Sequence, residues 1–158
     1  MTQPVVTCLW FNGNAEEAAK YYVQLFPNSH IGNIPRYPEG GPVEAGTAIS
    51  VPFTLNGQSW LALNGNSDVQ FNPSVSFVIR CENQEEIDHY WDHMIQDGGK
   101  AAMCGWLEDP FGVWWQIVPA MLGELMGGSD QAKSGKVLQA LIKMQKIDMA
   151  ALEAAYNA

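Results

Sequence analysis

The sequence has few basic residues and no long apolar segment. Eight Lys and Arg stand against 17 Asp and Glu in 158 residues, a formal net charge of -9. Because phosphate backbones and anionic lipid surfaces are bound by clustered positive charge, we expect neither nucleic acid nor a membrane as a partner. No apolar run approaches the roughly 20 residues that span a bilayer. Residues 1–4 lack the basic flank of a signal peptide, so we expect a cytoplasmic protein.

Soft metal ligands are also scarce. Cys8, Cys81 and Cys104 are odd in number, widely spaced and without a C-x-x-C pair, which argues against a disulfide framework and a thiolate metal cluster. We expect buried thiols, and Cys104 is a weaker candidate for a nucleophile because Lys100 is its one cationic neighbour in the sequence.

His89 and His93 have the i, i+4 spacing that can hold zinc. The apolar stripe of their helix lies elsewhere, so we expect both on its solvated face.

The chain contains an internal repeat. Residues 14–22 return as residues 83–91 at an offset of 69, with Asn, two Glu and Tyr kept in place. Each Asn can cap a helix, and the Glu three residues later can complete a capping box. Runs rich in β-branched and aromatic residues precede both helices, at 5–11 and 75–81. The sequence therefore predicts two copies of a β-α unit.

Further strands follow the first helix. Residues 31–37 form an irregular strand pattern, and residues 48–55 and 58–64 flank Asn56-Gly57. This dipeptide readily adopts positive φ and is typical of a type I′ hairpin. The first module is therefore predicted to be βαβββ.

The second module reads as a shortened βαββ(β). Residues 100–107 form one strand pattern and residues 113–118 another. Between them, Glu108 and Asp109 have the residue types for general acid-base chemistry. Asp109 also begins a D-P-F-G turn signature, in which Asp caps its own backbone, and we favour the turn.

The last segment differs in charge from the rest of the chain. From residue 129 onward, four Lys stand against three acidic residues. An apolar stripe at helical spacing predicts one helix, through Leu138, Leu141, Ile142 and Gln145, and Asp148 caps another. We expect this cationic tail to dock on the acidic body, either on its own domain or on a second subunit.

Four local sequences carry a resemblance to a known family: LWFNGNAEEA (9–18), FTLNGQ (53–58), FNPSVSF (71–77) and GWLEDPFGVWWQIVP (105–119). They resemble the PhnB-like branch of the vicinal oxygen chelate superfamily, which includes glyoxalase I, bleomycin-resistance proteins and extradiol dioxygenases. Members of this branch often carry the label 3-demethylubiquinone-9 3-methyltransferase. No strand in the sequence is followed by the Gly-rich turn and later acidic residue that hold adenosyl cofactors, and we expect no cofactor.

The resemblance implies an α+β fold. Two tandem βαβββ modules form a cupped mixed sheet, the glyoxalase/bleomycin resistance/dihydroxybiphenyl dioxygenase fold, with C-terminal helices. The implied organisation is one PhnB-like domain over 1–120, made of modules at about 1–66 and 72–119, and a helical extension over 121–158. Relatives commonly pair, so the resemblance also implies a homodimer.

Metal-dependent members of the superfamily take four ligands from the first and last strand of each module. The matching positions here hold uncharged groups: Thr7 and Ser76 on the first strands and Gln116 on the last, while residues 60–64 contain no carboxylate. Such groups bind divalent metals poorly, so we expect no metal.

Aromatic residues are the strongest positive signal for a site. Trp114 and Gln116 are two residues apart on a strand and so lie on one face. An aromatic wall with a neutral amide suits a flat or apolar small molecule. The candidate ligand-binding residues are Thr7, Trp60, Ser76, Trp106, Trp114 and Gln116. The alternative is that these aromatic residues simply fill the cup.

Three functions remain open. The first is a metal-free small-molecule-binding protein with an aromatic-lined cup, which binds an aromatic or apolar ligand. The second is an enzyme, either a glyoxalase-type lyase or isomerase or a dioxygenase-like enzyme, with an atypical metal site. The third is an interaction module that binds another protein through its basic tail.

Overall fold

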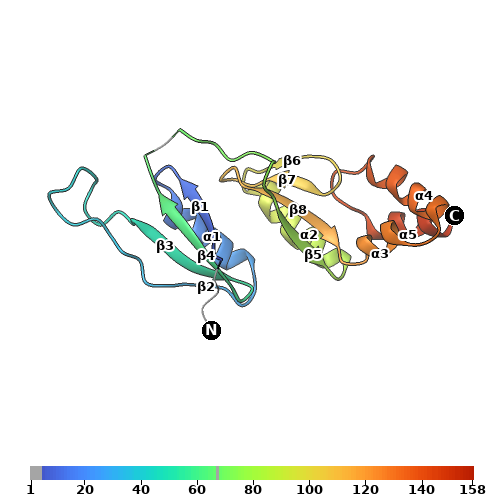
Figure 1. Cartoon of the computed structure of the whole chain (residues 1–158), viewed down its shortest axis with the longest axis horizontal. Coiled ribbons are helices and arrows are strands. Elements are labelled where there is room, and N and C mark those ends of the chain that lie inside the picture. Colours follow the sequence, from blue (N-terminus) through green and yellow to red (C-terminus); the bar gives the residue numbers. More distant parts are fainter. Residues whose placement is uncertain (1–4, 67) are drawn as a thin grey trace. The chain divides into compact units, whose positions relative to one another are not determined.

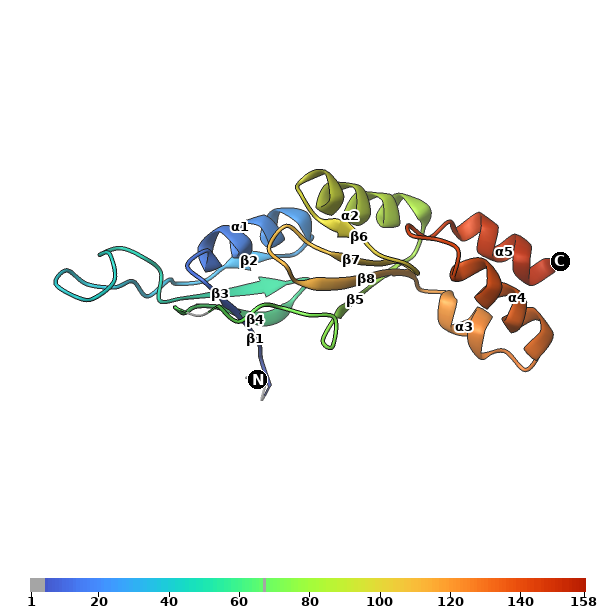
Figure 2. The same ribbon diagram turned by 90° about the horizontal axis from the view of Figure 1, so that it is seen from above.

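The computed structural model describes residues 5–66 and 68–158. Residues 1–4, on which the signal-peptide expectation rests, lie outside this part. The chain divides into two compact units, Met1–Val69 and Gln70–Ala158. Each unit contains a four-stranded mixed sheet with a helix over one of its faces (Figures 1 and 2).

The first unit has the predicted βαβββ order. Its strand order is β1-β4-β3-β2, in which β1 runs parallel to β4 and the other neighbours are antiparallel. The elements are β1 (Thr7–Phe11), α1 (Ala15–Leu25), β2 (His30–Ile31), β3 (Ser50–Leu55) and β4 (Gln58–Asn64).

The hairpin between β3 and β4 has the predicted turn. Asn56 and Gly57 have φ values of 47° and 79°, as a type I′ turn requires. The strands alternate as half-buried strands do, with Val51, Phe53 and Leu55 buried. Phe53 stacks on Tyr22 of α1 at a ring-centroid distance of 6.2 Å. The core of this unit therefore lies between the sheet and α1.

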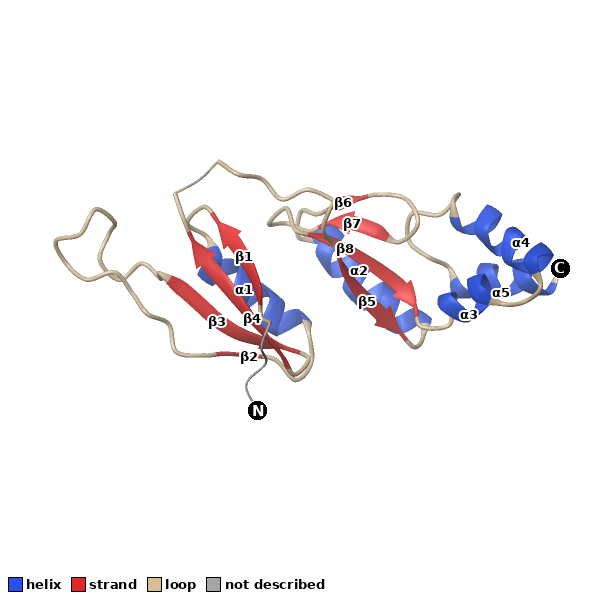
Figure 3. Cartoon of the chain, in the orientation of Figure 1, coloured by secondary structure: helices blue, strands red, loops and turns tan. Residues whose placement is uncertain are grey.

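The second unit repeats the βαβββ order, with strand order β5-β8-β7-β6 (Figure 3). Its elements are β5 (Phe77–Cys81), α2 (Gln84–Gln96), β6 (Lys100–Ala101), β7 (Trp106–Glu108) and β8 (Trp114–Pro119). The prediction of one strand over 100–107 is wrong. Cys104 and Gly105 have φ values of 62° and 81° and form a turn that separates β6 from β7.

The capping prediction is confirmed for one helix and wrong for the other. At α2, Asn83 Oδ1 accepts a hydrogen bond from the Glu86 N–H at 2.9 Å, as predicted. Glu86 Oε2 accepts from the Glu82 N–H at 2.8 Å, one residue before the N–H that a capping box uses. At α1, Asn14 makes no side-chain cap. Asn64, at the end of β4, accepts from the Ala15 N–H at 2.9 Å instead.

The two modules repeat at two different offsets. The helices follow the predicted offset of 69, but β1 and β5 share the same burial pattern at an offset of 70. The loop before α1 has three residues, 12–14, whereas the loop before α2 has two, 82–83. Because a one-residue shift moves every side chain of a strand to the other face, Thr7 corresponds to Phe77 and not to Ser76.

Three helices complete the second unit: α3 (Leu122–Gly127), α4 (Gln131–Leu141) and α5 (Met149–Asn157). Asp148 caps α5 as predicted, accepting from the Ala151 N–H at 3.0 Å. The predicted apolar stripe is wrong in part, because Leu138 and Ile142 are 45% and 53% exposed. The buried cluster of this helical segment consists of Val137, Leu141, Ile147 and Leu152.

The cysteines differ in their surroundings. Cys81 is buried as expected, and burial, with Glu86 and Glu82 nearby, raises its pKa to about 12. Cys104 is half-buried, whereas Cys8 is exposed, contrary to the prediction.

None of the helices in 5–66 and 68–158 has the length and apolar character to cross a membrane.

Asp109 holds the turn that leads into β8, as its sequence signature predicts. Its Oδ1 accepts from the Phe111 and Val113 N–H groups at 2.8 and 3.0 Å, and its Oδ2 accepts from Trp115 Nε1 at 2.8 Å. The residue is only 3% exposed. The carboxylate therefore satisfies three donors in the interior of the second unit.

We expect Asp109→Ala to lower the free energy of unfolding by about 2–4 kcal/mol, because the substitution leaves buried donors, among them the Trp115 indole N–H, without their acceptor. Chemical denaturation followed by tryptophan fluorescence measures this loss. Asp97→Ala, at an exposed position after α2, is the control, with an expected change within about 0.5 kcal/mol. Equal effects of the two substitutions would contradict the account of Asp109.

A second carboxylate makes the first unit acid-sensitive. Glu16 receives hydrogen bonds from Arg36, its main partner, and from Lys20, and these hold the Glu16 pKa at about 2, below its ordinary value of 4.5. A pKa that is lower in the folded state adds stability above the unfolded-state value, and this stability is lost as the pH falls toward about 2. Because the pair is partly exposed, the effect is small.

We therefore expect Glu16→Gln to lower the thermal midpoint more at pH 6 than at pH 2. Calorimetric scans at the two pH values measure the difference, and Glu17→Gln serves as the control on the same helical turn. A Glu16→Gln effect that is equal at both pH values would show that the Arg36 pair does not contribute to stability.

Candidate functional site

The face of the second sheet that is turned away from α2 carries most of the candidate residues. On β8, Trp115 and Ile117 are buried beneath α2, so Trp114 and Gln116 lie on the opposite face. On β7, Leu107 is fully buried, so Trp106 shares that opposite face. We call this surface the open face of the second unit.

The strand register brings these side chains together. Trp106 pairs with Gln116 across β7 and β8, and Gln116 pairs with Val78 across β8 and β5. The Gln116 Nε2 donates a hydrogen bond to Ser76 Oγ at 2.9 Å. Four of the six predicted residues, Ser76, Trp106, Trp114 and Gln116, therefore lie on one face of one sheet.

Thr7 and Trp60 do not belong to this group. They are register partners in the first unit, and Trp60 is 8% exposed, with its ring 6.1 Å from the Phe53 ring. Phe53 in turn stacks on α1, so both residues lie on the helix-covered face of their sheet. The offset of 69 had aligned Thr7 with Ser76, and the longer loop before α1 is the physical reason that they face opposite sides.

Glu108 and Lys100 also lie on the open face, and neither was among the predicted site residues. Glu108 belongs to β7, where it pairs with Trp114 on one side and with Lys100 on the other. Lys100 Nζ lies 3.4 Å from Glu108 Oε1. The alternation of Trp106, Leu107 and Glu108 is the sequence signal that could have placed Glu108 on this face.

The first sheet also has an open face, which carries both apolar and polar side chains. Cys8 and Trp10 of β1 lie on it, opposite the buried Leu9 and Phe11. Trp10 is 48% exposed, and a Cβ added to Gly65 would collide with its indole. Trp10 is therefore held against the backbone at Gly65, at the end of β4.

A divalent metal does not fit the groups on the open face of the second unit. Ser76 and Gln116 contribute a hydroxyl and a carboxamide that bond to each other, and neither is charged. The carboxylate of Glu108 on the same face is paired with Lys100. Among the residues that the structure describes, no three His, Cys, Asp or Glu side chains gather as a metal site would require. His89 and His93 are exposed on α2, as predicted, with His93 Nδ1 2.6 Å from the His89 carbonyl oxygen.

Comparison with known proteins decides the family. The family model for 3-demethylubiquinone-9 3-methyltransferase matches residues 3–118, which include the strands of both sheets except Pro119, the last residue of β8. The chain belongs to this family. The PhnB-like resemblance of its sequence is thereby confirmed, and it is a member of the vicinal oxygen chelate superfamily.

Solved structures place this PhnB-like protein among known folds. The PhnB protein from Bacillus cereus, which bears the name 3-demethylubiquinone-9 3-methyltransferase, is 40% identical, with a TM-score of 0.69 over 75% of this chain and 100% of that chain. A Pseudomonas aeruginosa protein is 18% identical, with a TM-score of 0.62 over 75% and 98%.

A fosfomycin resistance protein from Listeria monocytogenes is 13% identical to the PhnB-like chain, with a TM-score of 0.53 over 78% of this chain and 98% of that chain. At such identities the similarity shows the fold alone. The glyoxalase/bleomycin-resistance fold class, α+β with C-terminal helices, is confirmed. No curated protein matches the chain.

Proposed function

We propose that this PhnB-like protein binds a flat aromatic or apolar small molecule on the open face of the second unit, without a metal. The observation that carries the proposal is the grouping of Trp106 and Trp114 around the hydrogen-bonded pair of Gln116 and Ser76. Two indoles offer a large apolar surface, and aromatic rings stack on one another favourably. The polar pair between the strands adds directional hydrogen bonding.

The Gln116 carboxamide can bind a polar group of the ligand. It has one acceptor oxygen and two N–H donors, and the bond to Ser76 uses one of the donors. The bond also fixes the orientation of the amide, which leaves its oxygen as the defined acceptor for a ligand hydroxyl or N–H. A neutral ring with one hydroxyl, such as 2-naphthol, matches this set of groups.

The family name includes a methyl transfer, and the strand-helix loops favour binding instead. Adenosyl cofactors are held at a Gly-rich turn between a strand and a helix. The loops that follow β1 and β5 are Asn12-Gly13-Asn14 and Glu82-Asn83, and neither is Gly-rich. We therefore propose a binding protein rather than a methyltransferase.

Calorimetric titration with 2-naphthol tests the proposal. We expect Trp114→Ala or Trp106→Ala to weaken binding by about tenfold, because each removes one stacking surface. Leu138→Ala is the control, since it removes an exposed apolar side chain from α4, away from the sheet. Equal affinities for the wild type and both tryptophan variants would refute the proposed site.

Metal analysis tests the second part of the proposal. We expect mass spectrometry of protein purified without chelator to find less than stoichiometric metal, and EDTA to leave the 2-naphthol affinity unchanged. Both expectations follow from the neutral groups at Ser76 and Gln116 and from the pairing of the Glu108 carboxylate with Lys100. A stoichiometric metal, or binding that EDTA abolishes and Mn²⁺, Ni²⁺ or Zn²⁺ restores, would favour a metal-dependent enzyme of the superfamily instead.

A further inference from the structure

The turn that precedes Trp106 is held by the C-terminal helices. The Cys104 N–H donates to the Met144 carbonyl oxygen at 2.7 Å, and the Gly105 N–H donates to the Gln145 carbonyl oxygen at 2.8 Å. Both acceptors belong to the loop between α4 and α5, residues 142–148, which we call the α4–α5 loop. Trp106, the first residue of β7, follows this turn directly.

The turn fits tightly between the α4–α5 loop and β8. Gly105 has a φ of +81°, which a larger residue adopts only with strain. A Cβ at this position would lie 2.6 Å from the Ile117 carbonyl oxygen and 2.8 Å from Ile147 Cδ1. Ile147 is itself fully buried, so the loop forms one wall of the space that the turn occupies.

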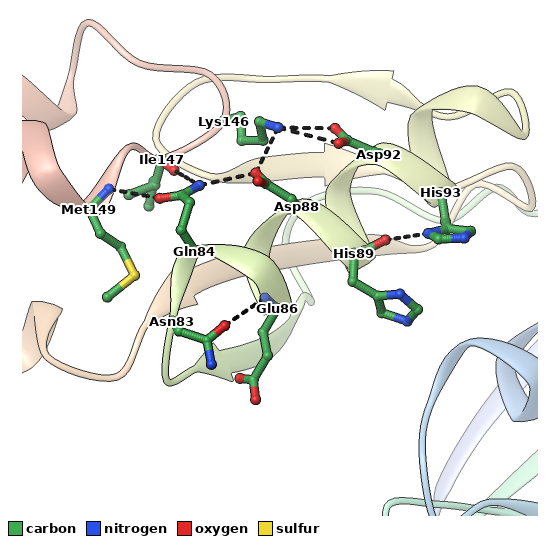
Figure 4. A network of polar contacts seen from close by, with 10 residues as sticks. All are labelled: Asn83, Gln84, Glu86, Asp88, His89, Asp92, His93, Lys146, Ile147 and Met149. Atoms are coloured by element: carbon green, nitrogen blue, oxygen red, sulfur yellow. Dashed lines mark hydrogen bonds and ion pairs between the residues drawn. The ribbon is translucent and has the colours of Figure 1, made fainter.

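Side chains of α2 hold the α4–α5 loop in turn (Figure 4). Lys146 Nζ lies 2.8 Å from Asp88 Oδ1 and 3.1 Å from Asp92 Oδ1. Gln84 Nε2 donates to the Ile147 carbonyl oxygen at 3.1 Å, and Gln84 Oε1 accepts from the Met149 N–H at 3.0 Å. The loop is therefore attached to α2 on one side and to the Cys104-Gly105 turn on the other.

These contacts connect the part of the chain that the family model matches to a segment beyond the match. The family match ends at residue 118, whereas the turn's hydrogen-bond acceptors lie at Met144 and Gln145. Backbone hydrogen bonds that satisfy a strained turn define its conformation. The start of β7 is therefore hydrogen-bonded, through this turn, to the α4–α5 loop.

We propose that the α4–α5 loop is a positioning element for Trp106. Lys146 clamps the loop to α2, the loop holds the Cys104-Gly105 turn, and the turn sets the position of the Trp106 indole on the open face. Its effect on binding rests on the proposed function, because it requires that an aromatic ligand contacts Trp106.

The test uses full-length protein labelled with 5-fluorotryptophan, with the six ¹⁹F resonances assigned by single Trp→Phe substitutions. We expect Lys146→Ala to shift or broaden the Trp106 resonance, and Lys146→Arg to restore it. Trp10 and Trp60, in the first unit, are internal references and stay unchanged. Lys143→Ala is the matched control: this loop lysine makes no ion pair among the residues that the structure describes.

The 2-naphthol affinity of each variant supplies the second reading. We expect Lys146→Ala to weaken binding by about two- to fivefold, in keeping with the modest strength of exposed ion pairs, and Lys143→Ala to leave it unchanged. A Trp106 resonance that Lys146→Ala leaves in place, or that Lys143→Ala moves equally, overturns the proposal.

Two further outcomes are separable. If Lys146→Ala alters all six resonances, Asp92→Asn decides by the same criteria. This substitution removes the charge of one partner of Lys146 and keeps the size of the side chain at position 92. If 2-naphthol does not bind the wild-type protein, the proposed function fails on its own, and the Trp106 resonance still tests whether the loop positions this indole.

Discussion

The arrangement of the candidate site depends on the alternation of β8 beneath α2. Trp115, Ile117 and Pro119 are buried on the helix side, and a strand can bury these residues only by presenting Trp114 and Gln116 to the other side. Asp109 stabilises this orientation of β8 because it accepts hydrogen bonds from the Trp115 indole N–H and from the backbone of the preceding turn. A one-residue slip of β8 would expose the core and bury the site.

The features of the fold that could be predicted from the sequence are local ones. Strand alternation, the Asn56-Gly57 hairpin and the Asp109 turn are local features, and each appears where the sequence indicates. The placement of Trp114 and Gln116 on one face also needed only the period of a strand. A sequence pattern predicts the relation between residues that are neighbours in the chain or that lie two apart on one strand.

Features that depend on loop length or on distant partners were beyond the sequence. The loop before α1 has three residues and the loop before α2 has two, although the helices repeat without a shift. Thr7 therefore lies on the helix-covered face of its own sheet, whereas Ser76 lies on the open face of the other sheet. Asn64 caps α1 from the end of β4, 49 residues away. The turn at Cys104-Gly105, which divides the predicted strand into β6 and β7, is likewise held by contacts with Met144 and Gln145. No local sequence pattern predicts these contacts.

The chemistry of the open face then favours binding without a metal. Its polar centre is a hydroxyl and an amide joined by one hydrogen bond of 2.9 Å, and its apolar part includes two indoles. In the proposed function, the open face of this PhnB-like protein serves for stacking and hydrogen bonding, and the α4–α5 loop, beyond the residues that the family model matches, positions Trp106 at one edge of it.

A crystal structure of the protein with 2-naphthol, grown without chelator, tests this account most directly. The account predicts a ring stacked on Trp106 and Trp114, with its hydroxyl within hydrogen-bonding distance of the Gln116 carboxamide oxygen and no metal between ligand and protein. A metal ion that bridges the ligand to the protein, or a ring bound away from these indoles, would contradict it.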